Sequence, residues 1–214
     1  MSCKVSFLRR LPKQKRSKQG VDRILDAAAE VFMEVGYEAA TTHMIAARAK
    51  TAIGSLYQFF PDKLAIFSAL EVLYIEQGRA LGRSLFTKVS AQLSLEQFIE
   101  QMLDGYIQFL ERPVPRIIFM QYFANPKMFR WVNSSFTQEF VKPLSNALKL
   151  WNPALTSEKC DLLANVCIQC FNTLMFVALQ SEEPYRQELL KQIRDLLTSY
   201  LRPYVRDEDF IRKS

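Results

Sequence analysis

Apolar residues recur at helical spacing in almost every window of this chain. The first stretch shows the pattern clearly, because its apolar stripe consists of Ile24, Leu25, Ala28, Val31, Phe32 and Val35. A helix carries residues with this spacing on one face. Sustained alternation of apolar and polar residues, which would indicate strands, is nearly absent, and so are Asn-Gly and Asp-Gly hairpin turns. The pattern therefore predicts an all-α protein.

Capping residues, glycine and proline mark where these helices begin and end. Gly36 follows the first stripe, at a position where a helix commonly ends with positive φ. Thr42 and Thr156 are expected N-caps, and Ser94 and Gln97 form a capping box. About nine helices are predicted: one ending at Gly36, then 43–49, 52–59, 61–86, 94–111, 113–123, 125–151 with Pro143 as a kink, 157–181, and a last one ending near Tyr200.

Residues 42–63, THMIAARAKTAIGSLYQFFPDK, predict two short helices joined by a tight turn. Ile45, Ala46 and Ala49 give the first helix a small apolar face that allows close packing. Leu56 and Phe60, four residues apart, give the second helix its inward stripe. Such a helix-turn-helix presents its second helix to the major groove of DNA. DNA binding is therefore the leading hypothesis.

Charge is concentrated at one end of the chain. The 214 residues carry a net charge of +6, with 49% hydrophobic and 23% charged residues, an ordinary globular balance. The cations of the first twenty residues are Lys4, Arg9, Arg10, Lys13, Lys15, Arg16 and Lys18, with no acid among them. A charge run is usually a solvated surface. Beside a helix-turn-helix, neutralisation of DNA phosphates explains this basic arm better.

Other bulk features restrict the class of protein. No apolar run approaches the roughly 20 residues of a membrane span, and the N-terminus lacks the apolar segment of a secretory signal. Four cysteines, three of them on one predicted helix, do not resemble a disulfide framework. We therefore expect a cytoplasmic, nucleoid-associated protein with no membrane contact. No phosphate loop, nucleophile–base pair or metal signature appears, so neither an enzyme nor a cofactor is predicted.

Residues 18–86 resemble the N-terminal domain of the tetracycline-repressor (TetR) family of bacterial regulators. The matching positions are Ile24, Leu25, Ala27, Ala28, Phe32, Gly36, Tyr37, Thr41, Thr42, Ile45, Ala46, Ala49, Gly54, Ser55, Leu56, Tyr57, Phe59, Phe60 and Lys63. The resemblance implies a flexible basic arm at 1–17, a helix-turn-helix domain at 18–64 and a helical effector-binding and dimerisation domain at 65–214. It also implies a homodimer that binds double-stranded, near-palindromic operator DNA and is released by a small-molecule effector, most often as a repressor.

The resemblance also implies which residues contact DNA. Together with the basic arm and the turn, the candidates are Lys18, Thr42, His43, Lys50, Ala52, Ile53, Gly54, Ser55, Tyr57, Phe59 and Lys63. His43 could instead be an ordinary surface residue, and Tyr57 and Phe59 could be core aromatics. The turn departs from the family's Ala-Gly-Val-Ser, because Lys50 stands where glycine is usual. Lys50 in a left-handed conformation would cost about 1 kcal/mol and could return some of it as an extra phosphate contact.

The C-terminal part is rich in aromatic residues, which line apolar ligand cavities but more often only pack a core. Residues 98–151 hold eleven of the chain's 26 aromatics. The candidate effector-binding residues are Tyr106, Phe109, Phe119, Tyr122, Phe123, Trp131, Asn133, Phe136, Phe171 and Met175, with Gln121 and Gln138 as further polar anchors. As a set they favour an apolar or aromatic effector, which the sequence does not identify.

Cys160, Cys167 and Cys170 lie on one face of a predicted helix. Packing in a core or dimer explains them best, since Cys behaves as a small hydrophobe and metal-binding pairs usually sit on turns. The homodimer is expected to form through the last two helices, about 157–181 and 185–201, as a four-helix interface. Two alternatives remain open: a ligand-blind DNA-binding protein, and a thiol-redox-sensing regulator that uses the three cysteines.

Overall fold

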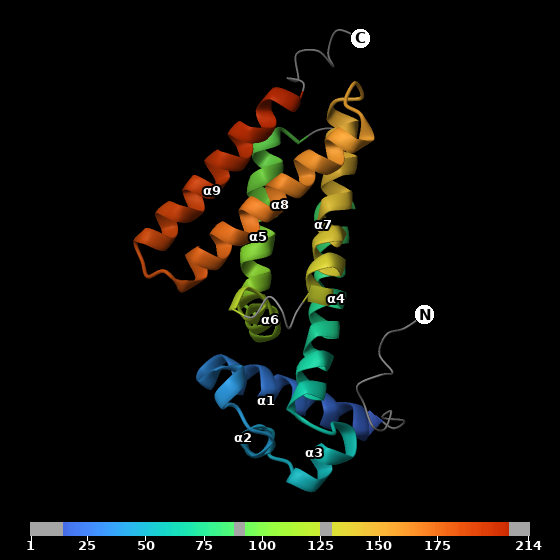
Figure 1. Cartoon of the computed structure of the whole chain (residues 1–214), viewed down its shortest axis with the longest axis vertical. Coiled ribbons are helices and arrows are strands. Elements are labelled where there is room, and N and C mark those ends of the chain that lie inside the picture. Colours follow the sequence, from blue (N-terminus) through green and yellow to red (C-terminus); the bar gives the residue numbers. More distant parts are fainter. Residues whose placement is uncertain (1–14, 88–92, 125–129, 206–214) are drawn as a thin grey trace. The chain divides into compact units, whose positions relative to one another are not determined.

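The structure is a computed structural model that describes residues 15–87, 93–124 and 130–205, with side chains at all of these except 15, 16, 86, 87 and 130–137. Every regular element in these ranges is a helix, which confirms the all-α prediction (Figure 1). The helices are α1 Lys15–Ala39, α2 Thr42–Arg48, α3 Ile53–Phe59, α4 Lys63–Thr87, α5 Leu95–Leu110, α6 Pro113–Ala124, α7 Arg130–Trp151, α8 Ser157–Gln180, α9 Tyr185–Leu201 and the 3₁₀ helix η2 Arg202–Tyr204.

Several predicted helix boundaries are confirmed in their hydrogen bonds. The capping box opens α5, because the Ser94 N–H donates to the Gln97 side chain at 3.0 Å and the Gln97 N–H donates to the Ser94 hydroxyl at 3.2 Å. The Thr156 hydroxyl accepts from the Lys159 N–H and so caps α8. Gly36 interrupts α1 with φ 78° and ψ 163°, a conformation that is essentially restricted to glycine.

Two predicted start signals are wrong by one or two residues. Thr41, not Thr42, caps α2 by accepting a hydrogen bond from the Met44 N–H. Pro61 does not open α4, which begins at Lys63. The carboxylate of Asp62, the residue before it, accepts a hydrogen bond from the Ala65 N–H at 2.8 Å. The predicted start at residues 125–126 lies outside the described residues.

Contacts divide the chain into two compact units, one formed by residues up to 77 with 110–132, the other by 78–109 with 133–214. The first unit, called the head below, contains α1 to α3, the beginning of α4, and α6, and α1 packs against both α2 and α6. Its core includes the mutually contacting rings of Phe32, Tyr37 and Phe67. The predicted functional boundaries at residues 17 and 64 stay predictions.

The second unit, called the body below, contains α5, α7, α8, α9 and the end of α4. Tyr106 is the centre of its aromatic core, with ring centroids 5.8 Å from Phe109, 5.5 Å from Phe140 and 4.9 Å from Phe171. Helices α8 and α9 pack side by side (Figure 1). All four rings of this cluster are buried, so they form a continuous apolar core.

Helix α8 is more apolar than expected from the sequence. By length and composition it could cross a membrane, although half of its most apolar window is buried inside the protein. The sequence analysis did not identify α8 as long and apolar enough to span a membrane. Polar residues such as Asn165 and Gln169 interrupt its apolar run. The other half of this window lies on the surface of the body.

One acidic side chain is buried in the head. Glu71 of α4 is only 9% exposed. Burial raises the pKa of Glu71 to about 7, because a carboxylate loses hydration there, and the Ser68 hydroxyl that hydrogen-bonds to it limits the rise. The proton on this carboxyl group therefore affects the stability of the head near neutral pH.

Replacing Gly36 with alanine should destabilise the protein by about 1–3 kcal/mol, because any Cβ is strained at this φ and ψ although no neighbouring atom obstructs it. Gly20→Ala is the matched control on the same helix, where a Cβ also meets open space and the backbone is ordinary. Gly20→Ala should increase the free energy of unfolding by at most about 1 kcal/mol. Urea unfolding of both variants measures this, and equal effects would contradict it.

Replacing Glu71 with glutamine should remove a pH-dependent loss of stability. The folded-state pKa of about 7 exceeds the ordinary glutamate pKa of 4.5, so the wild type loses stability as pH rises from about 4.5 to about 7. After allowance for solvent screening this loss is about 1–3 kcal/mol. The gain from Glu71→Gln over wild type in urea unfolding should therefore grow between pH 5 and pH 8.

Glu111→Gln, in an exposed turn of the same unit, controls for the loss of one negative charge. A gain from Glu71→Gln that stays constant with pH would show that the Glu71 carboxyl group does not titrate differently in the folded protein.

Candidate nucleic-acid interface

The helix-turn-helix is built on the inward residues that the sequence indicated. Ile45 and Ala46 of α2 and Leu56 and Phe60 at α3 are at most 3% exposed. Ala52, Gly54, Tyr57 and Gln58 are exposed, and Ile53, Ser55 and Phe59 are half-buried. Among residues 52–59 only Leu56 is buried. Helix α3 therefore has one anchored side and an open surface.

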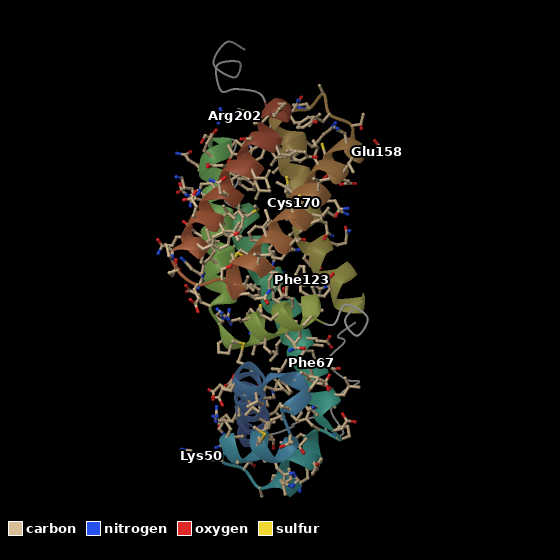
Figure 2. The ribbon with its side chains drawn as sticks, turned by 60° about the vertical axis from the view of Figure 1, so that its left-hand side comes forward. Lys50, Phe67, Phe123, Glu158, Cys170 and Arg202 are labelled. Atoms are coloured by element: carbon tan, nitrogen blue, oxygen red, sulfur yellow. The ribbon has the colours of Figure 1, made fainter. Side chains whose placement is uncertain are left out.

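The turn between α2 and α3 contains the one left-handed residue, apart from glycine, among those described. Lys50 has φ 50°, as expected if it replaces a turn glycine. The Lys50 N–H donates to the Ala47 carbonyl at 3.1 Å and the Thr51 N–H donates to the Ala46 carbonyl at 3.0 Å, the two hydrogen bonds of a Schellman motif. The Lys50 side chain is exposed beside the start of α3 (Figure 2).

The first residue of α2 is joined to the middle of α3. The Thr42 and Tyr57 hydroxyl oxygens lie 2.9 Å apart, and both side chains lie on the surface of the head. This hydrogen bond brings two candidate DNA contacts together. Ala52 is the N-cap of α3 and makes no side-chain capping hydrogen bond.

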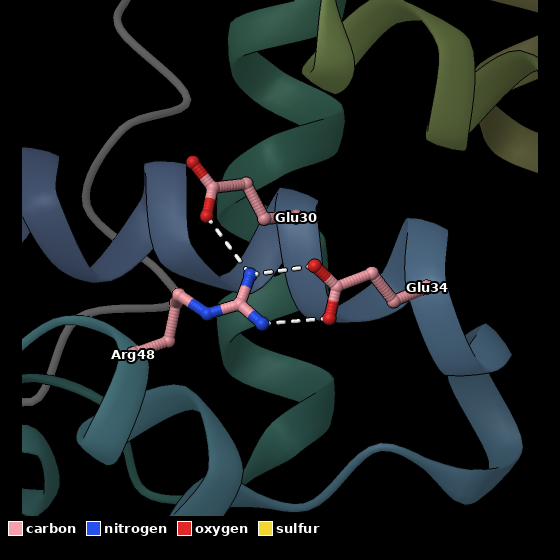
Figure 3. Close-up of polar contacts among 3 residues, drawn as sticks. All are labelled: Glu30, Glu34 and Arg48. Atoms are coloured by element: carbon pink, nitrogen blue, oxygen red, sulfur yellow. Dashed lines mark hydrogen bonds and ion pairs between the residues drawn. The ribbon is translucent and has the colours of Figure 1, made fainter.

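An ion-pair cluster that sequence analysis missed holds α2 against α1. Arg48 donates to Glu34 through two bonds of 2.8 Å and 2.6 Å and to Glu30 through one of 3.0 Å (Figure 3). The hydrogen bonds from Arg48 lower the pKa of Glu34, and the two carboxylates raise the pKa of Arg48. Glu30 and Glu34 are one helical turn apart, but nothing in the sequence indicates that Arg48 lies opposite them.

The remaining candidate contacts have different surroundings. His43 on α2 and Lys18 on α1 are exposed, and residues 1–14 of the basic arm lie outside the described residues. Lys63 is half-buried, and its ammonium group donates to the main-chain carbonyls of Tyr37 and Glu38. The DNA contacts of all these residues remain predictions.

The candidate effector residues are divided between the two units. Tyr106, Phe109 and Phe171 meet in the core of the body, and Met175 is buried on α8. Phe119, Tyr122 and Phe123 make ring contacts with one another on α6 in the head. Trp131, Asn133 and Phe136 lie on α7, and their side chains are outside the described residues. Of the further polar anchors, Gln138 is exposed and Gln121 half-buried.

The three cysteines of α8 have unequal exposure. Cys160 and Cys167 are buried, and Cys170 is exposed (Figure 2). Burial raises the pKa of the Cys160 thiol and raises that of Cys167 to about 12. Both therefore stay as thiols at physiological pH, which disfavours redox chemistry at these two positions. No group of three or more His, Cys, Asp or Glu that could hold a metal occurs within the described part of the chain.

Family profiles match both parts of the chain. The profile of "Bacterial regulatory proteins, tetR family" matches residues 24–70, and that of "Tetracyclin repressor-like, C-terminal domain" matches residues 94–201. The second match alone includes half of the chain. Together they contain α2, α3 and most of the body helices.

Individual relatives share sequence with about a third of the chain or less. The A-factor receptor protein of Streptomyces griseus is 45% identical over 60 residues, which are 28% of this chain and 22% of that protein. The repressor KstR of Mycolicibacterium smegmatis is 45% identical over 70 residues, 33% of this chain and 29% of KstR. The chain spans less than a third of the length of these curated relatives.

A solved structure extends the comparison to most of the chain. SmeT, the repressor of the Stenotrophomonas maltophilia multidrug efflux pump SmeDEF, matches with a TM-score of 0.64 at 20% identity, over 88% of this chain and 91% of SmeT. A second SmeT structure is a complex with triclosan. At this identity the match shows a shared fold.

Proposed function

The chain belongs to the tetracycline-repressor (TetR) family of bacterial regulatory proteins, and from this premise we propose that it is a repressor released from a near-palindromic operator by a small apolar or aromatic effector. Membership of the family makes it a DNA-binding transcriptional regulator and not an enzyme. Regulators of this family bind operator DNA and small-molecule effectors and act as dimers.

The open surface of α3 carries the proposal. Gly54 lies inside this helix, and a Cβ built there would meet no atom within 4 Å. Neither crowding nor positive φ requires glycine at position 54. Glycine is nevertheless present there, and it lowers the stability of a helix by about 1 kcal/mol relative to alanine. A missing side chain on an exposed recognition helix lets a DNA strand approach the backbone closely. Intermolecular contact explains this residue better than folding does.

The proposed DNA-contacting surface surrounds that glycine. Exposed or half-buried residues on α2, the turn and α3 supply it: Thr42, His43, Lys50, Ala52, Ile53, Gly54, Ser55, Tyr57 and Phe59. Lys50 and Lys18 supply positive charge for phosphates, whereas Ala52, Ser55 and Phe59 would face the bases. The Thr42–Tyr57 pair offers two hydroxyl groups at one place, which suits a phosphate oxygen.

The dimer would form through α8 and α9. Exposed apolar side chains remain on both helices, including Leu162 and Val177 on α8 and Tyr185 and Leu196 on α9. On α8 the exposed or half-buried residues Leu162, Val166, Cys170, Thr173 and Val177 fall within an arc of about 80°. An apolar face of this kind on two packed helices fits a twofold four-helix interface. This interface would also cover part of the surface of α8 that is not buried within one chain.

The effector proposal rests on the aromatic core of the body. Tyr106 with its three ring neighbours offers mostly apolar contacts and one hydroxyl group, a composition that suits an apolar or aromatic molecule. Relatives named as the A-factor receptor and as SmeT with triclosan support a small organic effector. Burial of Cys160 and Cys167 makes the thiol-sensing alternative the weaker one. We place the protein in the cytoplasm, on the chromosome.

Operator binding tests the proposed function directly. Sites selected from random DNA, or the region upstream of the gene, should show two protected half-sites about one helical turn apart. Affinity should fall steeply with salt, and an apolar effector from a compound panel should remove the protection. Gly54→Ala should weaken operator binding about tenfold or more. The same change should raise the free energy of unfolding of the free protein by about 0.5–1 kcal/mol.

Gly20→Ala is the matched control for that experiment, and we expect it to change operator affinity no more than about twofold. Salt-insensitive binding without sequence-dependent protection by the wild type would contradict the proposed function. Wild-type affinity in Gly54→Ala would contradict close approach of DNA at this residue.

A charge placed on the proposed dimer face should dissociate the dimer. Leu196→Glu puts a carboxylate into an apolar contact, where its desolvation opposes association. Leu150→Glu, on the 69% exposed Leu150 of α7, is the matched control outside this face. Sedimentation equilibrium should show monomers for Leu196→Glu and dimers for the control and wild type at micromolar concentration. If only the control Leu150→Glu dissociated the dimer, the interface would not lie on the proposed face of α8 and α9.

A further inference from the structure

The end of α2 is fastened to α1 by the side chain of Arg48. Arg48 is the last residue of α2, and its guanidinium group donates to the Glu34 carboxylate at 2.8 Å and 2.6 Å and to the Glu30 carboxylate at 3.0 Å (Figure 3). Two parallel bonds to one carboxylate fix the direction of the guanidinium plane as well as its distance. Arg48 therefore restricts how the end of α2 can rotate against α1.

Four acids form a row on α1, and the last two of them are the acceptors just described. All four are exposed, and their spacing of four residues places them along one side of the helix: Asp22, Asp26, Glu30 and Glu34. Partial burial, and then the charges of Asp22 and Glu30, raise the pKa of Asp26, which shows that the row repels itself. Glu34 stands two residues before the break at Gly36, near the end of the helix where a carboxylate opposes the dipole. The row therefore does not stabilise α1 by itself.

The same acids are unfavourable for a head that binds DNA, because carboxylates repel phosphates. A contact within the head gives the last two of them a role. The hydrogen bonds from Arg48 lower the pKa of Glu34, so the Glu34 carboxylate stays charged at neutral pH and the ion pair is maintained. The arrangement of Glu30 and Glu34 is explained by their contact with α2 and not by α1 alone.

The position of Arg48 connects this contact to the recognition helix. The left-handed turn residue Lys50 follows two positions later, and α3 begins at Ile53. The beginning of α2 is held separately, by the hydrogen bond between the Thr42 and Tyr57 hydroxyl groups. A rotation of the end of α2 would therefore carry the turn and the first residues of α3 with it.

We infer that Arg48 is a positioning residue for operator recognition, which sets the direction of α3 by holding the end of α2 against Glu30 and Glu34. This inference rests on the proposed operator binding and deepens it. The buried side chains of Ile45 on α2 and Leu56 on α3 keep both helices in the head without the ion pairs. Because exposed ion pairs add little stability, the cluster acts on the orientation of α3 more than on folding.

Glu34→Gln tests this by the sign of its effect. Removal of a carboxylate reduces repulsion of DNA, so general electrostatics predicts equal or tighter binding. A positioning role predicts weaker operator binding, because a neutral amide cannot form the paired charged bonds with Arg48. Asp26→Asn is the matched control, since it removes one charge from the same row and Arg48 donates only to the other two acids.

The affinity of each variant is measured by fluorescence anisotropy for operator and for unrelated DNA of the same length. The measurements are made at a temperature where circular dichroism shows every variant fully folded. The ratio of the two affinities separates a change in base contacts from a uniform change in charge. Arg48→Met and the double variant Arg48→Met/Glu34→Gln complete a double-mutant cycle, which reports whether the two residues act through each other.

We expect Glu34→Gln to lower the ratio of operator to unrelated affinity about fivefold and Arg48→Met to lower it about tenfold, the equivalent of roughly one base contact. The double variant should match Arg48→Met alone, because both changes remove the same contact. Asp26→Asn should leave the ratio unchanged and bind both DNAs equally well or up to about twofold more tightly. The melting temperature should fall by no more than about 3 °C in any variant.

Two outcomes would overturn the inference. If Glu34→Gln and Asp26→Asn behave alike, the Glu34 carboxylate affects DNA binding only through its charge. If Arg48→Met weakens both DNAs equally and its effect adds to that of Glu34→Gln, Arg48 contacts phosphate and does not act through Glu34. Both outcomes leave the proposed function intact, whereas a wild type that binds no operator would contradict the proposed function and the inference with it.

Discussion

The anchoring of α3 is the constraint on which DNA recognition by this chain depends. The helix is seven residues long, whereas an isolated helix needs about 12–15 residues to be even marginally stable in water. Its neighbours must therefore supply both its stability and its direction. Leu56 and Phe60 are buried on one side of α3, the Lys50 turn precedes its first residue, and Lys63 joins the start of α4 to the end of α1. Arg48 adds an electrostatic connection between α2 and α1. The exposed surface of α3 remains accessible to a binding partner.

Sequence periodicity predicted the helices and their inward faces because burial imposes a repeat of about 3.6 residues. The left-handed conformation of Lys50 was indicated by the family resemblance, because the family usually has glycine at this position of the turn. Sequence analysis misplaced the cap of α2, since Thr41 and Thr42 are neighbouring residues with the same capping chemistry. The Arg48 cluster and the Lys63 contacts escaped it. Both join residues from 14 to 26 positions apart, and no local pattern records such pairs.

The effector residues show a second limit of reading along the chain. Aromatic residues from 98 to 151 appeared as one group because they are close in sequence. The structure assigns Tyr106 and Phe109 to the body and Phe119, Tyr122 and Phe123 to the head. Phe171, far along the chain, contacts Tyr106 directly. Which of these rings lie together depends on packing that spacing along the chain does not encode.

Lys50 and Gly54 together argue that this surface is shaped by binding more than by folding. Stability alone would favour glycine at the left-handed position 50 and a side chain at the helical position 54, and the chain has the reverse. Each choice costs on the order of 1 kcal/mol in the free protein. A cation at position 50 and an open backbone at position 54 are both useful beside a phosphate backbone. Lys50 and Gly54 are four residues apart, and each is unfavourable for folding but suited to contact with DNA. Folding alone explains this pair poorly, whereas a DNA-binding surface is expected to contain such residues.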